Sequence, residues 1–369
     1  MSEIGHTRLA NFEVLRSLAM LLVVIWHSFF YICGAHPFPT TATGISNYIL
    51  SELVVILCNA HVDVFILVSG YFLLGKSFNT KRVLSLWFQV FFYSFAFTVL
   101  GWLIFANKPS WDSLRYAFFP LTNDNYWFFT RYIGLVVLCP FLSKAATALS
   151  KVEYRYFLIA LIVFCCTFTY VIPLGNTMGA AKGYSLLWFI ALFFWGGYFR
   201  LFGSSLDRRR CLRYFFATAL LVALFCFGKA VYRYISAGTA PELELLAYNG
   251  FAFPLAVFLF LVFSKSSCDK GFLSTILKKV SPFSFGVYIC SEHFVIRPLL
   301  WETGVPWRTL IDTFWFIPTV IVFCILVFFA CAGIDLLRAR LFDLMHVPQA
   351  ADNLGKWLTQ KINPLISRL

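Results

Sequence analysis

Long apolar stretches, separated by short polar or charged segments, account for most of this chain. An α-helix needs about 20 predominantly apolar residues to cross the hydrocarbon core of a bilayer. Stretches of this kind occupy residues 12–33, 49–74, 82–106, 126–143, 156–174, 184–200, 212–234, 243–264, 281–301 and 311–337. The pattern predicts an all-α polytopic membrane protein with about ten transmembrane helices.

No internal repeat, low-complexity linker or soluble insertion separates these stretches, so we expect one transmembrane domain over residues 8–340. The first stretch lacks a small-residue cleavage site and is expected to be a retained helix rather than a signal peptide. Residues 341–369 form a tail. Its apolar residues recur at helical spacing beside lysines, namely Leu354, Trp357, Leu358 and Ile362 beside Lys356 and Lys361. This spacing indicates either a short helix on the inner membrane surface or a frayed terminus.

The composition, 60% hydrophobic and 13% charged, excludes an ordinary soluble domain. A net charge of +13 would suggest a nucleic-acid partner in a soluble protein, but its distribution indicates membrane topology. With the N-terminus in the cytoplasm, most basic loop residues fall on the inner side. The opposite loops then hold only Lys108, Arg115, Lys182, Lys229, Arg233, Arg297 and Arg308. This asymmetry predicts a cell-membrane protein with both termini cytoplasmic, basic loops facing the lipid bilayer, and no nucleic-acid partner.

The eleven cysteines include no CxxC pair, and most lie inside the apolar stretches. Unpaired cysteines in such positions are typical of small packing residues. We therefore expect no metal site, no disulfide framework and no permanently bound cofactor.

Two ionisable side chains, Arg16 and His27, lie in the first apolar stretch, where charge is costly and indicates function. Helix geometry places them within about 20° of one face and about 16 Å apart along the axis. Each has a simpler interpretation. Arg16 could reach the inner headgroups or pair with Glu13 one turn earlier, and a single buried histidine is most often a hydrogen-bonded packing residue.

Other polar residues fall near the middle of two further stretches. His61 and Asp63 are central in the second, and Glu292 and His293 are central in the ninth. Together with His27 they could form one buried polar centre. Because residues two apart on a helix face different ways, His61 and Asp63 are not expected to form a dyad, and at most one of Glu292 and His293 should face the same cavity.

The second stretch ends in Ser69-Gly70-Tyr71-Phe72. A glycine beside a small hydroxyl lets another helix, or a thin ligand chain, approach the backbone closely. Helix packing alone would explain this motif. At this depth, near Arg16, it could equally form the floor of a narrow tunnel open to the cytoplasm.

Several motifs follow one another in a recognisable order. The first stretch places His27 eleven residues after Arg16, and the second runs from Val62-Asp63-Val64-Phe65 to the Ser69-Gly70-Tyr71-Phe72 motif. The later motifs are Tyr126-Trp127-Phe128 with Cys139-Pro140-Phe141-Leu142, Trp188-Phe189 with Gly196-Gly197-Tyr198-Phe199-Arg200, and Ser284-Phe285-Gly286-Val287-Tyr288. The first two motifs resemble the Arg-x10-His and Ser-Gly-x-Phe patterns of the acyltransferase-3 family of integral membrane acyltransferases. The others are similar to its surface polysaccharide O-acyltransferase branch.

The resemblance implies an intramembrane cavity enclosed by the helices, in a bacterial cell membrane. It further implies acetyl-CoA or another acyl-CoA as the donor and an envelope glycan or lipid-linked saccharide as the acceptor. The family's arginine and histidine correspond to Arg16 and His27. Two positions depart from the family pattern: Arg82 is followed three residues later by Ser85 in place of a second basic residue, and Ser291, followed by Glu292, stands where many relatives have histidine.

Acyl transfer from a thioester to an alcohol needs a base for the hydroxyl proton or a nucleophile that holds the acyl group, and a neutral imidazole can do either. We expect His27 to be the catalytic base or transient acyl carrier. Arg16 would position the donor or the imidazole, and Asp63 would orient an imidazole.

The remaining site residues are assigned to the two substrates. The residues expected to bind acyl-CoA are Arg16, Ser69, Gly70, Phe72, Lys81 and Arg82. Those expected to bind the acceptor are Tyr126, Trp127, Tyr288 and Glu292. For Tyr126 and Trp127 the alternative role is anchoring in the aromatic belt of the membrane interface.

Two other functions remain open at this point. The same intramembrane histidines and aspartate could serve a proton-coupled transporter or flippase, although no paired Gly/Pro-interrupted stretches in two matching halves support it. Alternatively, the acyl group could be transferred to a small secreted molecule. Assembly as a homo-oligomer also stays open.

Overall fold

The computed structural model describes residues 9–35, 38–105, 110–121, 126–167, 181–237, 250, 252–268 and 270–366. All regular structure in these ranges is helical. The longer helices are α1 (Ala10–Ala35), α2 (Ala42–Cys58), α3 (His61–Leu73), α4 (Thr80–Phe105), α6 (Trp127–Ala148), α7 (Lys151–Ile162), α9 (Leu186–Phe202), α10 (Arg208–Ala237), α11 (Phe253–Ser264), α16 (Phe316–Leu344) and α17 (Val347–Ile366). The shorter ones are α5 (Trp111–Phe118), η2 (Val163–Thr167), η3 (Ala181–Gly183), α12 (Phe272–Val280), η5 (Ser281–Phe283), α13 (Ser284–Ser291), α14 (Ile296–Pro298), η6 (Leu299–Thr303) and α15 (Trp307–Leu310).

Each of the ten apolar stretches coincides with helix in the part of the chain that the structure describes. Parts of the fifth and eighth stretches, residues 168–174 and residues 243–249 with 251, lie outside that part. The segments long and apolar enough to cross a membrane are α1, α2 with α3, α4, α6, α10 and α16, and α9 and α11 are shorter apolar helices. The prediction of an all-α polytopic membrane protein is confirmed.

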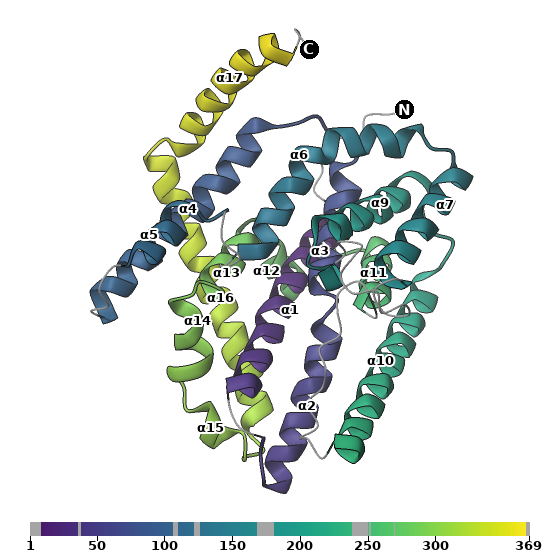
Figure 1. Ribbon diagram of the computed structural model, residues 1–369, viewed down its shortest axis with the longest axis vertical. Coiled ribbons are helices and arrows are strands. Elements are labelled where there is room, and N and C mark those ends of the chain that lie inside the picture. The colour runs from purple at the N-terminus through teal and green to yellow at the C-terminus, as the bar shows by residue number, and fades with distance from the viewer. Residues whose placement is uncertain are drawn as a thin grey trace.

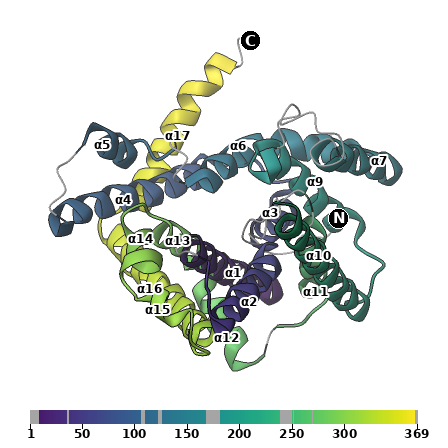
Figure 2. The same ribbon diagram turned by 60° about the horizontal axis from the view of Figure 1, so that its bottom comes forward.

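Helix α1 lies at the centre of the bundle (Figures 1 and 2). It contacts α2, α3 and α11 on one side and α12, α13 and α16 on the other. Helix α4 packs against α5, α13 and α17, whereas α10 packs against α11 and α2. The C-terminal helix α17 extends beyond the bundle at the top of Figure 1 and rests on the start of α4. A helix is thus present in the tail where the sequence spacing indicates one, and its position on the membrane surface stays a prediction.

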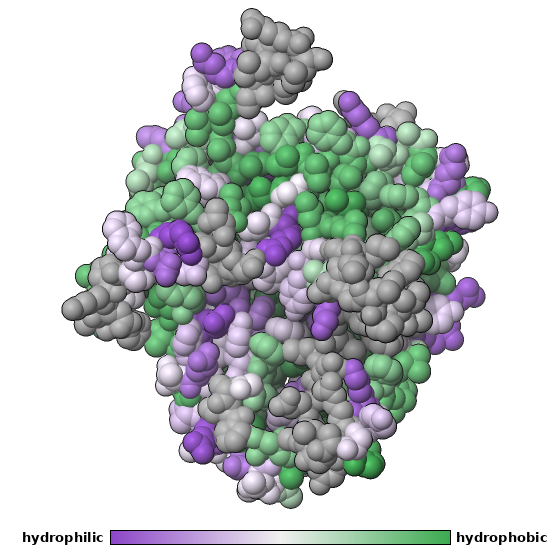
Figure 3. Space-filling model, viewed as in Figure 1, coloured by the Kyte–Doolittle hydropathy of each residue, from purple (hydrophilic) through white to green (hydrophobic). Residues whose placement is uncertain are grey.

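Large apolar side chains cover much of the outer surface, as the green areas of Figure 3 show. Those exposed on α10 and α16 include Phe216, Leu220, Leu221, Leu224, Val322, Leu326, Phe329 and Leu337. A soluble protein would leave such continuous apolar surfaces uncovered at a large cost, whereas lipid chains solvate them. The outward faces of these helices are therefore lipid-facing.

The closest helix crossing joins α3 and α9. A Cβ atom on Gly70 would lie 2.5 Å from the carbonyl oxygen of Phe193, and one on Gly196 would lie 2.3 Å from that of Leu67. Between membrane helices, attraction comes from close van der Waals contact, which small residues permit. Gly70 and Gly196 therefore bring the two backbones into direct contact.

Two of the predicted spans are interrupted near their middle. The second breaks at Asn59 and Ala60, between α2 and α3, and the ninth breaks after Ser291, where Glu292 caps α13. Irregular backbone at membrane depth is tolerated where protein surrounds it. Both breaks are buried, because Asn59 is 5% exposed and Glu292 is 6% exposed. Each break brings a polar side chain close to α1.

Candidate active site

His27 lies near the end of α1 with one ring nitrogen fixed by its own helix. Its Nδ1 is 2.9 Å from the carbonyl oxygen of Val23, one turn earlier. Because a carbonyl can only accept a hydrogen bond, Nδ1 carries the proton in the neutral ring. The other nitrogen, Nε2, is then the unprotonated one and can act as a base.

Glu292, at the break in the ninth span, faces that nitrogen. Its Oε2 is 3.4 Å from His27 Nε2 and also accepts a hydrogen bond of 3.3 Å from the Tyr31 hydroxyl. Arg297 donates to the same hydroxyl at 3.4 Å, and its guanidinium lies 4.8 Å from the centre of the Tyr31 ring. Within the described residues, Glu292 Oε1 has no hydrogen-bond partner. One carboxylate oxygen is thus left for a bound group.

A cavity borders His27 on the side of α3 and α6. It is small, with a volume of about 20 Å³, and its lining is mainly apolar: Met20, Val23, His27, His61, Val62, Phe65, Trp127, Phe128 and Tyr288. The break between α2 and α3 brings His61 to this lining, with its Nδ1 2.7 Å from the Cys58 carbonyl oxygen. The centres of the His27 and His61 rings are 6.3 Å apart. Two imidazoles therefore border the same cavity.

Asp63 lies on a different side of α3 from His61, as their spacing indicates. Its Oδ1 accepts a hydrogen bond of 2.9 Å from Trp188 Nε1 on α9, and the residue is fully buried. Its Oδ2 has no partner within the described ranges. Asp63 thus contacts an indole rather than the imidazole that it is expected to orient.

His293 turns away from its neighbour Glu292. Its ring packs against Phe97 and Tyr126, and its Nδ1 accepts a hydrogen bond from the backbone N–H of Val295. Of the two adjacent residues, only Glu292 faces His27.

Arg16 lies at the opposite end of α1 from His27. It forms an ion pair of 3.1 Å with Glu13, and its guanidinium is 5.3 Å from the centre of the Phe72 ring. Its side chain is 31% exposed. The structure thus contains the ion pair between Arg16 and Glu13 that their spacing in the sequence allows. It also brings Arg16 next to Phe72, the last residue of the Ser-Gly-x-Phe motif.

Within that motif, each small residue already has a structural contact. The Ser69 hydroxyl donates a hydrogen bond of 2.9 Å to the Phe65 carbonyl, and Gly70 lies against the backbone of α9 at Phe193. Close helix packing therefore accounts for Gly70.

The two basic residues after the second span face different neighbours. Lys81 Nζ is 3.8 Å from Asp352 on α17, whereas Arg82 donates a hydrogen bond of 3.0 Å to the Tyr132 hydroxyl on α6. The hydrogen bond from Lys356 lowers the pKa of Asp352, which keeps this carboxylate ionised between the two lysines. Lys81 therefore contacts the tail, and Arg82 contacts α6.

The aromatic residues expected at the acceptor divide into two groups. Trp127 and Tyr288 line the His27 cavity directly. Tyr126 stands behind Tyr288, with its hydroxyl 3.3 Å from the Ile289 carbonyl oxygen and the two ring centres 6.1 Å apart. Tyr126 is buried, so its ring packs inside the protein.

Sequence analysis missed a second buried polar cluster, centred on Asp335 in α16. Gln89 and Tyr93 donate to its Oδ1 at 2.9 and 2.8 Å, and Arg338 donates through both Nε and Nη2 at 3.0 Å. A Cβ atom on Gly286 would lie 2.2 Å from the Asp335 carboxyl carbon. An aspartate inside the last apolar stretch was a signal for this cluster.

These features define a polytopic membrane protein with a buried acid–base site, in which the His27 imidazole borders a cavity and the Glu292 carboxylate lies beside that imidazole. Residues 9–337 match the family described as an acyltransferase domain. The chain therefore belongs to the acyltransferase-3 family and is a membrane acyltransferase. Comparisons with curated proteins and with solved structures gave no match.

Proposed function

We propose that this protein is an O-acyltransferase that moves an acyl group, in the first place acetyl, from cytosolic acyl-CoA to a hydroxyl of an envelope glycan or lipid-linked saccharide. One observation carries this proposal. In a buried cavity, His27 has Nδ1 held by Val23 and presents Nε2 toward Glu292 at 3.4 Å. An imidazole held in this way has its unprotonated nitrogen fixed in place to remove a proton from a hydroxyl.

The reaction then balances as follows. The acceptor hydroxyl gives its proton to His27 Nε2 while its oxygen attacks the thioester carbonyl carbon. The carbon–sulfur bond breaks, and the CoA thiolate leaves and takes the proton from the imidazolium. Glu292 lies beside the charged imidazolium and stabilises it, and its Oε1 can accept a hydrogen bond from the sugar.

His27 could also carry the acyl group itself, with Nε2 attacking the thioester before the acceptor arrives. The same geometry serves this variant, because the contact of Nδ1 with Val23 leaves Nε2 as the nucleophilic nitrogen. Pre-incubation with labelled acyl-CoA, followed by quenching without acceptor, distinguishes the two routes, because only the second leaves label on the protein.

The proposed orientation puts the basic end of the bundle in the cytoplasm of a bacterial cell, with both termini on that side. Arg16 lies at this end of α1, and helix rise separates it from His27 by about 16 Å. A long thin arm such as that of CoA could span this distance. Acyl-CoA would thus be a substrate rather than a resident cofactor, and the lipid bilayer is the remaining partner.

The test uses membranes that carry the full chain, acyl-labelled acetyl-CoA and lipid-linked glycans, and follows label into the lipid and polysaccharide fractions. We expect His27→Gln to lower transfer by about 10²- to 10⁴-fold, the usual contribution of a positioned base. His346→Asn is the matched control, because His346 is exposed beyond the end of α16 and has a positive φ that asparagine tolerates. Transfer by the His27 variant at the rate of the control would refute the assignment.

A further inference from the structure

Arg297 is a cation beside the candidate active site whose charge has no ion-pair partner. It lies on the short helix α14, just after the break in the ninth span, and is half-buried. Among the described residues, no carboxylate forms an ion pair with its guanidinium. Its Nε is buried and has no hydrogen-bond partner there. Because a charge removed from water is costly unless it is paired, this arrangement calls for an explanation.

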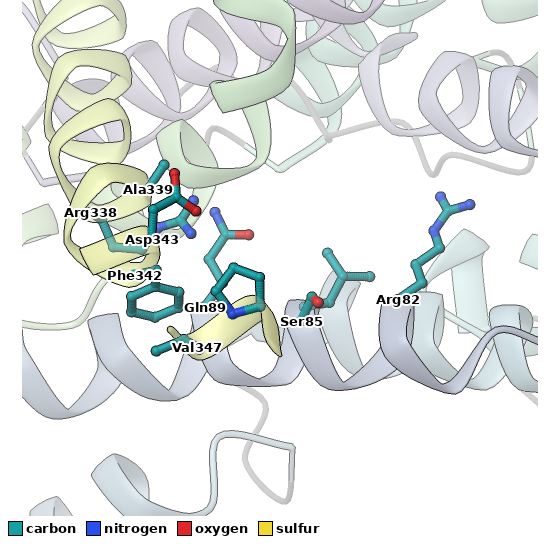
Figure 4. Close-up of a pocket in the computed structure, with 10 residues that line it drawn as sticks. Arg82, Ser85, Gln89, Arg338, Ala339, Phe342, Asp343 and Val347 are labelled. Atoms are coloured by element: carbon teal, nitrogen blue, oxygen red, sulfur yellow. The ribbon is translucent and has the colours of Figure 1, made fainter. Parts of the chain in front are cut away.

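Two other arginines in the predicted spans show the ordinary arrangement. Arg16 pairs with Glu13 at 3.1 Å. Arg338, which lines the pocket drawn in Figure 4, donates to Asp335 through Nε and Nη2 at 3.0 Å. Arg297 also belongs to the few basic residues on the predicted outer side, against the usual preference of basic residues for the inner side. Neither an ion pair nor the membrane topology therefore accounts for it.

The contacts of Arg297 lead directly to the active site through Tyr31. Its Nη1 donates to the Tyr31 hydroxyl at 3.4 Å, and its guanidinium is 4.8 Å from the centre of that ring. On α1, the Tyr31 ring stacks on the His27 ring, with centres 5.8 Å apart and planes at 17°. Arg297 and His27 thus contact the same aromatic ring, so a group as large as one sugar can reach both.

Two buried polar atoms beside this ring lack partners within the described ranges. Arg297 Nε is a donor, and Glu292 Oε1 is an acceptor. The other oxygen of Glu292 contacts Tyr31 and His27. A ligand that satisfies both atoms offers a hydroxyl to the carboxylate and an anionic oxygen to the guanidinium. A neutral sugar supplies only the hydroxyl, whereas a sugar that carries a carboxylate or a phosphate supplies both.

We propose that Arg297 is a specificity-determining residue that binds an anionic group on the acceptor sugar, while a hydroxyl of that sugar lies at His27 and Glu292. The anionic group neutralises Arg297 and holds the sugar in one orientation, so that the same hydroxyl is always presented to His27 Nε2. The inference rests on the proposed function, because it names the class of acceptor for that reaction. Arg297 itself takes no proton and forms no covalent bond in the transfer.

The test uses the glycan fraction that receives label from acetyl-CoA, divided into three portions. One is left untreated, one has its carboxyl groups reduced to alcohols, and one has its phosphates removed with cold hydrofluoric acid. The purified full chain in lipid nanodiscs acylates each portion with labelled acetyl-CoA. We expect kcat/KM of the wild-type chain to fall about tenfold or more for one treated portion, because a charge-assisted hydrogen bond is lost. The portion affected identifies the anionic group as a carboxylate or a phosphate.

Arg297→Gln should give the same low kcat/KM with all three portions. The loss should lie mainly in KM for the acceptor, with KM for acetyl-CoA unchanged. Arg297→Lys keeps the charge and should retain part of the preference. Arg308→Gln is the matched control, because Arg308 is exposed on α15 on the same predicted side. Thermal unfolding of each variant reports whether the fold is kept, and a merely structural arginine would change stability without changing the preference among the portions.

The outcomes separate this inference from the proposed function. Equal acylation of all three portions by the wild-type chain overturns the role of Arg297, as does a preference that survives in Arg297→Gln, and both leave the acyltransferase reaction standing. The comparison among portions needs only the wild-type chain, so it decides against an anionic acceptor even where Arg297→Gln does not fold. Absence of His27-dependent transfer to any glycan removes the proposed function, and this inference with it.

Discussion

The protein buries two polar clusters around carboxylates, and their hydrogen bonding differs. Asp335 has no solvent exposure and accepts four hydrogen bonds of 2.8–3.0 Å, from Gln89, Tyr93 and Arg338. Glu292 is equally enclosed, but its hydrogen bond from Tyr31 is long, 3.3 Å, and its Oε1 has no partner among the described residues. Only the second cluster borders the His27 cavity.

This difference separates a structural cluster from a functional one. A buried acceptor without a hydrogen bond costs about 1–3 kcal/mol, so most such groups in folded proteins are paired. Asp335 follows that rule and links α4 to α16. Glu292 departs from it beside a cavity, at a broken helix and next to an imidazole, which is where a substrate could provide the missing donor.

We expect the largest effect from a substitution in the Asp335 cluster. Asp335→Asn leaves the charge of Arg338, whose side chain is 14% exposed, without a counter-ion. Removing one partner of a buried ion pair costs about 3–5 kcal/mol. We expect a clear fall in the thermal unfolding temperature in detergent, with kcat of the remaining folded protein nearly unchanged. Asp112→Asn, at an exposed ion pair on α5, should leave that temperature as it is. Equal stability of the two variants would contradict the structural role of Asp335.

A second change addresses the functional cluster. Glu292→Gln keeps the shape and removes the charge that stabilises the imidazolium, so we expect transfer to fall by about 10²-fold, as for other groups that stabilise developing charge. The unfolding temperature should stay the same or rise, because a buried charge has been removed. Glu302→Gln, exposed just beyond the end of the same predicted span, is the control. Loss of stability with full activity in the folded fraction would reverse our assignment of the two clusters.

We expect the smallest effect from a substitution of a neighbour of Glu292. Tyr31→Phe removes the hydrogen bond that Tyr31 donates to Glu292, together with the hydroxyl to which Arg297 donates, while the ring that stacks on His27 remains. A single hydrogen bond contributes about 0.5–1.5 kcal/mol, so we expect transfer to fall only about two- to tenfold. Steady-state kinetics at saturating donor measure this. An effect as large as that of Glu292→Gln would mean that Tyr31 itself contacts the substrate.

The sequence predicts the helices well, because the thickness of the bilayer fixes the length of each apolar stretch. It also directs attention to His27 and Glu292, since charge inside such stretches is costly. It cannot predict that these two side chains meet, because they belong to distant helices whose relative rotation depends on packing. Nor does it predict the break after Ser291, which has no proline or glycine beside it and is held by the surrounding protein.

Two residues show where local patterns allow opposite conclusions. Gly70 suits a ligand tunnel and a helix contact equally well in the sequence, and only the approach of Phe193 shows that it makes the contact. Asp335 lies one turn before Arg338 near the end of an apolar stretch, where an ion pair at the membrane surface is an ordinary explanation. Its actual partners, Gln89 and Tyr93, lie on α4 and are visible only in the fold.

The bond between His27 and the Val23 carbonyl joins two residues of a single helical turn. The segment from Val23 to His27 therefore fixes the orientation of the reactive nitrogen by itself, without the other helices of the bundle. Substitutions in the walls contributed by α3, α6 and α13 change what can reach that nitrogen without changing where it points. The walls of the cavity can therefore be redesigned one helix at a time, while α1 keeps the reactive nitrogen in place.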